Sequence, residues 1–400
     1  MSNTLITQIS WLEPLLPSSL PFTLLEKADQ VLFESGKLSA LLAPKTAQCL
    51  AKTLQLTNSY YSNLIEGQYT EPLQLSQTQS NKRPAKELNE LAVYHMHTQS
   101  IMERFFTRHQ QHITWQDCFS PQFIEKIHAL LFKDACEQQR LLADNTLMVA
   151  GVLRDLAQKN VSVGQHDAPD FSAVRKMLIR MQQVYGHQQD KRLCLISALA
   201  YHHRLSWVHP FPDGNGRVIR LISHLQLFKL GLVSPLWSLS RGLARQQSLY
   251  YARLANADEP RRHDLDGRGQ LSQQGLCEFI DFMLDTCLDQ MRYIQQSLAL
   301  PSLRTRLEKI LTYEQAFIDA RIDPEAAARA LHILITQGEV TRNDFKIYLG
   351  MNDRSATTTL TQLIKLNVVK SPTPKSRLLY LNLPVWFAQL LFPDLHRRFI

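Results

Sequence analysis

Apolar residues recur at three- and four-residue spacing along most of the chain, which is the period of an amphipathic α-helix. This spacing predicts helices over Phe22–Leu42 and Ala47–Ile65, and Gly67 follows the second of them as a helix stop. A longer helical block is predicted from Lys86 to Asp190. The fold class is therefore expected to be mainly α.

The helical period is interrupted inside that block. Between Gly151 and Asp170 the alternating run Asn160–Val163, followed by Gly164, predicts a short β-hairpin. Beyond the block, Leu193–Leu205 is a strongly apolar helix that leads into a glycine-containing loop. A further helix is predicted over Arg217–Leu230, closed by Gly231.

The last hundred residues have a different pattern. Three helices are predicted over Glu325–Gln337, Val340–Leu349 and Asp353–Leu366, and two short β-like runs joined by a turn follow between Val368 and Leu381. Three helices followed by a hairpin predict a winged helix-turn-helix domain. The expected domains are an N-terminal helical region over 1–85, a catalytic core over 86–300 and this C-terminal domain over 301–400.

Composition narrows the class of protein. A chain of 400 residues with 44% apolar residues is long enough for two or three packed domains. It has no long apolar run and no signal sequence, so we expect a soluble, cytoplasmic protein with no membrane partner. The six cysteines stand singly, without the spacing of a zinc site. A net charge of +8 is compatible with ligands that carry phosphate.

The segment His209–Arg220 gathers phosphate-binding groups in one short loop. Three residues with small or left-handed-tolerant backbones come directly before a predicted helix: Gly214, Asn215 and Gly216. A helix N-terminus favours an anion through its free N–H groups and its dipole. Arg217 and Arg220 are three residues apart on the first turn, so both guanidinium groups can bind phosphate oxygens from one face.

Two more side chains of this loop add reactive chemistry. Asp213 offers hard oxygen ligands suited to a Mg²⁺ ion that binds phosphates. His209 has an ordinary pKa of about 6.5 and can accept a proton near neutral pH. A base, a metal ligand, glycines and two arginines at fixed offsets together predict a site for phosphate chemistry.

The pattern His-Pro-Phe-x-Asp-Gly-Asn-Gly-Arg-x-x-Arg over His209–Arg220 resembles the complete signature of the Fic (filamentation induced by cyclic AMP) family of protein adenylyltransferases. The preceding Tyr201–Val208 is similar to the helix that leads into that motif, and the resemblance covers roughly residues 20 to 300. It implies a Fic-type helical bundle. It also implies transfer of AMP from ATP, with Mg²⁺, to Tyr, Thr or Ser hydroxyls of target proteins and of the enzyme itself.

The resemblance implies a role for each residue of the loop. His209 would be the general base that takes the proton of the target hydroxyl, and Phe211 would anchor the loop in the core. Asp213 would hold Mg²⁺ on the α- and β-phosphates. The three residues from Gly214 to Gly216 would form the anion hole, and the two arginines would hold the outer phosphates.

Two other segments resemble parts of the family's nucleotide site. Gly151-x-x-Arg154 and the run Val161–His166 resemble a β-hairpin flap whose backbone would pair with the target and whose tip would cover the nucleotide. The nucleotide contacts expected on the flap are Val163, Gly164, Gln165 and His166. Tyr250 and Tyr251 resemble an aromatic pair near the adenine pocket, which assigns Tyr251 to nucleotide binding.

Ser62-x-x-x-Glu66-Gly67, at the end of the second predicted helix, resembles the family's inhibitory motif. If Glu66 reaches Arg220, its carboxylate occupies the donor that the γ-phosphate needs and repels that phosphate. ATP could then bind only with its phosphates misplaced for attack. The resemblance thus implies an enzyme that Glu66 inhibits.

Other functions stay open. The chain could be a DNA-binding regulator with a nucleotide-sensing Fic core, or a deAMPylase or phosphotransferase that uses the same loop. Arg354 opens the third C-terminal helix, and four further basic residues near the expected wing could contact phosphates: Lys365, Lys370, Lys375 and Arg377. The partner of the C-terminal domain could thus be DNA or a second copy in a dimer.

Overall fold

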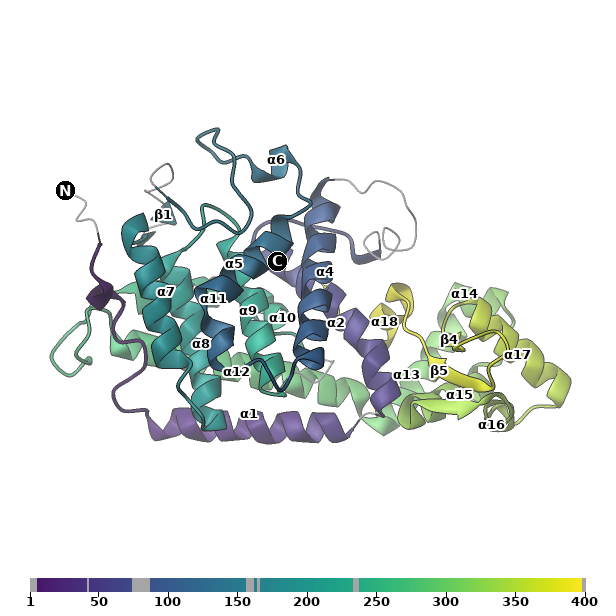
Figure 1. Ribbon diagram of the computed structural model, residues 1–400. Helices are drawn as coiled ribbons and strands as arrows, with labels where there is room; N and C mark the ends of the chain where they lie inside the picture. Colours follow the sequence, from purple (N-terminus) through teal and green to yellow (C-terminus); the bar gives the residue numbers. More distant parts are fainter. Residues whose placement is uncertain are drawn as a thin grey trace.

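The computed structural model describes residues 6–41, 43–73, 87–155, 162–163, 166–232 and 237–397. It is mainly helical, as expected, with a large helical body and a smaller C-terminal group beside it (Figure 1). The elements of the body are η1 (Ile9–Leu12), α1 (Phe22–Ala40), α2 (Pro44–Ile65), α4 (Glu87–Arg108), η2 (Gln116–Phe119), α5 (Pro121–Phe132), α6 (Glu137–Arg140), β1 (Ser162–Val163), β2 (His166–Asp167), α7 (Phe171–Tyr185), α8 (Lys191–Val208), α9 (Asn215–Lys229), α10 (Leu239–Arg245), α11 (Gln247–Asp258) and α12 (Gln273–Leu298). Within the described ranges, none of the helices has the length and apolar character needed to cross a bilayer.

The remaining elements belong to the C-terminal group and the segment that follows it. They are α13 (Leu300–Tyr313), α14 (Gln315–Asp319), α15 (Pro324–Gln337), β3 (Glu339–Thr341), α16 (Arg342–Leu349), α17 (Asp353–Lys365), β4 (Val369–Lys370), β5 (Leu378–Leu381) and α18 (Val385–Leu391). The three strands form an antiparallel sheet in the order β3-β5-β4.

Helices α8 and α9 lie at the centre of the body and pack against each other. The side chain of Asp190 caps α8 by accepting hydrogen bonds from the backbone N–H groups of Arg192, at 2.9 Å, and Leu193, at 3.3 Å. Both helices are buried on most of their faces. Their ends are therefore fixed by the core, and so is the short loop that joins them.

Helix α2 packs against α4 and α10 and ends beside the start of α9. Gly67 adopts the left-handed conformation, with φ of 74°. Its N–H donates to the Leu64 carbonyl at 3.0 Å, and the N–H of Gln68 donates to the Asn63 carbonyl at 2.9 Å. This is the Schellman pattern of helix termination, and it confirms the predicted helix stop.

The β alternation predicted over Asn160–Val163 overlaps strand β1 in its last two residues, and Asn160 and Val161 lie outside the described residues. Strands β1 and β2 pair antiparallel, with Ser162 opposite Asp167 and Val163 opposite His166. Gly164 and Gln165, two of the expected nucleotide contacts, lie outside the described residues, as does the side chain of Val163.

The prediction of a helix from Val340 was wrong at its start. Val340 lies in strand β3, opposite Leu379, and α16 begins at Arg342. The β-branched Val340 is buried in the sheet, a setting that suits it better than a helix end. Thr341 caps α16 instead, because its Oγ1 accepts the backbone N–H of Asp344 at 3.1 Å.

Helix α2 contacts both parts of the molecule. Near its first turn, Thr46 Oγ1 donates to the Ile335 carbonyl of α15 at 2.7 Å. Near its other end, Tyr61 donates through its hydroxyl to the carbonyl of Arg397 at 3.1 Å. The described chain thus returns after α18 to helix α2 of the large body.

Candidate active site

The loop between α8 and α9 is held by a buried arginine. His209 ends α8 in the left-handed conformation, with φ of 47°. Arg154, which is 3% exposed, donates through Nε to the His209 carbonyl at 2.7 Å and through Nη2 to the Val208 carbonyl at 3.1 Å. Its backbone N–H donates to the Pro210 carbonyl at 3.0 Å. Arg154 therefore fixes the backbone on which the His209 imidazole is mounted.

The His209 imidazole is half-buried. Burial lowers its pKa to about 4, and the positive charge of Arg154 and the nearby His166 add to the effect. The pKa thus lies below the ordinary value of about 6.5 for a histidine side chain. At neutral pH the ring is uncharged and can accept a proton.

The turn of the loop is braced from inside. Phe211 is fully buried, and its ring stacks on that of His128 with centroids 3.9 Å apart. Asn215 bridges the loop, since its Oδ1 accepts the Phe211 N–H at 3.0 Å and its Nδ2 donates to the Phe211 carbonyl at 2.7 Å. Gly214 has φ of 78°, and a Cβ there would meet the ring of Phe132. The glycine is thus required both by conformation and by space.

Asp213 lies at the exposed rim of the loop. Its side chain is 54% exposed, Oδ1 accepts the Gly214 N–H at 2.6 Å, and Oδ2 lies 3.6 Å from Nη2 of Arg217. The described residues contain no group of three His, Cys, Asp or Glu side chains that could enclose a metal ion. The donor set fits a Mg²⁺ that takes one carboxylate and draws its other ligands from phosphates and water.

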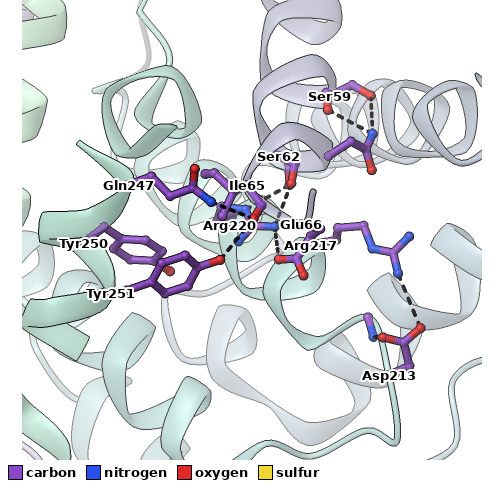
Figure 2. A network of polar contacts seen from close by, with 12 residues as sticks. Ser59, Ser62, Ile65, Glu66, Asp213, Arg217, Arg220, Gln247, Tyr250 and Tyr251 are labelled. Atoms are coloured by element: carbon purple, nitrogen blue, oxygen red, sulfur yellow. Dashed lines mark hydrogen bonds and ion pairs between the residues drawn. The ribbon is translucent and has the colours of Figure 1, made fainter. Parts of the chain in front are cut away.

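The two arginines of α9 point to different partners. Arg217 is 7% exposed at its side chain and lies over the Phe132 ring, 4.9 Å from its centroid, on the side of Asp213. Arg220 is turned toward α2, where Nε donates to Ser62 Oγ at 3.0 Å and Nη2 to the Ser62 carbonyl at 2.9 Å. Arg220 Nη2 also donates to Glu66 Oε1 at 2.6 Å (Figure 2).

Glu66 therefore occupies the place where an anion would bind α9. Its carboxylate lies so close to the Cα of Gly216 that a Cβ on that residue would overlap Oε1. Burial opposes ionisation of this carboxyl, but the charge and hydrogen bond of Arg220 outweigh it, so the pKa of Glu66 is lowered. An ionised carboxylate at the first turn of a helix is favoured by the helix dipole as a phosphate would be.

The end of α2 is also contacted from α11. The carbonyl of Ile65 accepts hydrogen bonds from Gln247 Nε2 at 3.0 Å and from the Tyr251 hydroxyl at 3.0 Å (Figure 2). The neighbouring Tyr250 is buried and bonds instead to His202 Nε2 at 2.9 Å. Tyr251, expected from the sequence at the nucleotide, thus lies against the residue next to Glu66.

The structure places most of the expected residues around one point, where the end of α2 meets the start of α9. His166 lies on β2, with Nε2 2.7 Å from the Trp207 carbonyl. Gln247 on α11 had no role in the sequence interpretation, and Arg154 was placed there on the flap rather than under the loop that it holds. No local sequence pattern could predict the contact of Arg154 with the loop, because Arg154 lies 55 positions before His209, whose carbonyl it binds.

Comparison with known proteins identifies relatives of this part of the chain. Residues 118–227 match the model of the Fic/DOC family. "Protein adenylyltransferase Fic" of Drosophila persimilis is 27% identical over 134 residues, which are 32% of this chain and 24% of that protein. The same protein of Drosophila pseudoobscura pseudoobscura matches equally. The chain therefore spans about a quarter of the length of these curated relatives.

A solved structure extends the similarity of fold beyond this region. The crystal structure of a Fic family protein from Desulfovibrio desulfuricans G20 superposes with a TM-score of 0.51 at 18% identity. The match covers 92% of this chain and 98% of that one. Identity at this level supports a common fold, and the chemistry must be argued from the site itself.

Proposed function

This chain is a Fic family protein, and from that premise we propose that it is a protein adenylyltransferase, moving AMP from ATP to Tyr, Thr or Ser hydroxyls of target proteins. The observation that carries the proposal is the imidazole of His209, mounted on backbone that Arg154 holds at the end of α8, beside the first turn of α9 where an anion can bind. A neutral base and a phosphate site on one rigid loop are what transfer to a hydroxyl requires.

In the proposed reaction, the oxygen of the target hydroxyl forms a bond to the α-phosphorus of ATP. The bond from that phosphorus to the oxygen that bridges to the β-phosphate breaks, and pyrophosphate leaves. His209 takes the hydroxyl proton. The N–H groups of the anion hole and Arg217 stabilise the charge on the phosphates, and Asp213 would hold Mg²⁺, which supplies further charge neutralisation when bound.

We propose that Glu66 keeps this activity low. Its carboxylate pairs with Arg220 and covers the Cα of Gly216, where the outer phosphates of a correctly placed ATP would bind. Ser62 supports the same state, because it bonds to Arg220 through both Oγ and its carbonyl. Gly67 terminates α2 so that Glu66 is the first residue beyond the helix.

The proposed transfer can be tested by intact-mass measurement of the purified protein and of candidate targets after incubation with ATP and Mg²⁺. The expected product carries the mass of AMP. A product that carries the mass of a phosphate would indicate a phosphotransferase. Loss of AMP from a pre-modified protein would indicate a deAMPylase. A protein that binds ATP without any change of mass would indicate a nucleotide-sensing regulator.

A second function is proposed for the C-terminal group, as a winged helix-turn-helix that binds DNA. The supporting observation is that basic residues lie exposed on α17 and on the connection between β4 and β5: Arg354, Lys365, Lys375 and Arg377. Such residues are suited to phosphate contacts. A gel shift whose affinity falls steeply with salt would support DNA binding. A protein that dimerises and shifts no DNA at low salt would indicate a dimer module instead.

A further inference from the structure

We propose that Gln247 and Tyr251 form a latch on the last carbonyl of α2 and thereby hold Glu66 in its inhibitory position. The proposal rests on the proposed function of Glu66. It makes the two residues of α11 positioning residues, which act on the nucleotide site through the backbone of α2.

The end of α2 needs partners from outside the helix. The last carbonyls of an α-helix have no donor in the following turn. The Schellman pattern satisfies two of them, because the carbonyl of Asn63 accepts from Gln68 and that of Leu64 accepts from Gly67. The carbonyl of Ile65 accepts instead from Gln247 Nε2 and the Tyr251 hydroxyl, each at 3.0 Å.

The two donors suit this task by their spacing. Gln247 and Tyr251 are four residues apart on α11, so they lie on the same face, one turn from each other. Gln247 supplies an N–H donor and Tyr251 an O–H donor, and both donate to the same carbonyl oxygen of Ile65. A carbonyl with two lone pairs can accept both, so the end of α2 is fixed in two directions.

The latch acts one residue away from Glu66. The Glu66 side chain is 34% exposed, whereas its partner Arg220 is 2% exposed and bonds to Ser62 as well. The arginine is therefore held by several contacts, and the position of the carboxylate depends on where the backbone of α2 ends. Release of the Ile65 carbonyl allows that end to move and weakens the pair of Glu66 with Arg220.

The test measures self-modification with labelled ATP for Gln247→Ala, Tyr251→Phe and the double variant. Each is made in the natural sequence and in a Glu66→Gly background. In the natural sequence, loss of one hydrogen bond should raise the rate by about two- to twelvefold. In the Glu66→Gly background neither variant should raise it further. Matched controls are Ser248→Ala, exposed on the same helix, and Tyr313→Phe, exposed on α13; both should leave the rate unchanged.

A second measurement is independent of catalysis. Hydrogen exchange of the backbone amides near Gly67 and Gln68 should become faster in the latch variants and stay unchanged in the two controls. The latch is overturned if the variants show natural rates and natural exchange while Glu66→Gly is activated. If Glu66→Gly leaves the rate of self-modification unchanged but exchange becomes faster in Gln247→Ala and Tyr251→Phe, then the two residues do hold the end of α2, and the proposed inhibitory function of Glu66 is wrong.

Discussion

Replacement of Glu66 by glutamine tests the proposed inhibition with the smallest change in shape. Glutamine keeps the length of the side chain and removes its charge, so Arg220 loses a charged partner at 2.6 Å. We expect Arg220 to become available to the outer phosphates of ATP. The rate of self-modification should rise.

An upper bound on the effect follows from the charge that is lost, because the amide oxygen of glutamine can still accept from Arg220. A hydrogen bond to a charged group contributes about 1.5–3 kcal/mol, which corresponds to about 10- to 150-fold in an equilibrium. Water screens the pair in part, because the Glu66 side chain is 34% exposed. The expected rise therefore lies toward the lower end, at about 10- to 30-fold.

The assay is the initial rate of AMP incorporation from labelled ATP, measured on equal amounts of folded protein. The matched control is Glu278→Gln, because Glu278 is also 34% exposed and pairs with Arg253 at 2.7 Å. Glu278→Gln should react at the natural rate. The reasoning is refuted if Glu66→Gln also reacts at the natural rate, or if Glu278→Gln is activated equally.

Further predictions concern the loop. Because burial lowers the pKa of His209 to about 4, the base form is present above that pH, so the rate of the Glu66→Gln enzyme should hold from about pH 8 to about pH 5.5; a fall centred near 6.5 contradicts this. His209→Ala should abolish the gain of AMP mass in the same enzyme. Gly214→Ala should lower the free energy of unfolding in thermal melts by about 1–2 kcal/mol or more, because φ is 78° and a ring blocks the Cβ, whereas Gly36→Ala, with open space in α1, should be neutral or stabilising. Asp213→Asn should raise the Mg²⁺ concentration needed for half-maximal rate severalfold, and an unchanged requirement would remove Asp213 as a ligand.

Local signals explain what the sequence could predict. The two glycines predicted to end helices, Gly67 and Gly231, both have positive φ. Glycine adopts this conformation readily, so a glycine that follows a periodic apolar run predicts the end of a helix. The loop from His209 to Gly216 could be predicted as a candidate site because its chemical groups lie within eight consecutive residues.

What could not be predicted depends on contacts between distant segments. The Ile65 carbonyl meets Gln247 across 182 positions, and no local pattern encodes that meeting. The pKa of His209 is set by how deeply the core buries the ring, which spacing along the chain does not reveal. Strand β3 was missed because three residues are too few to show an alternation, and their pairing partner β5 lies some forty positions later.

The contacts of helix α2 with the C-terminal residues limit how the protein can be shortened for experiments. It is a single 22-residue helix, about 33 Å long, whose first turn bonds to Ile335 and whose far end carries Glu66 into the site. A shortened protein that ends at Leu298 would lack Ile335 and the Arg397 carbonyl that Tyr61 binds. Rates measured on such a fragment would therefore describe a protein whose proposed inhibitory helix has lost the bond at its first turn and the Tyr61 bond near its far end, while Gln247 and Tyr251 still bind the Ile65 carbonyl.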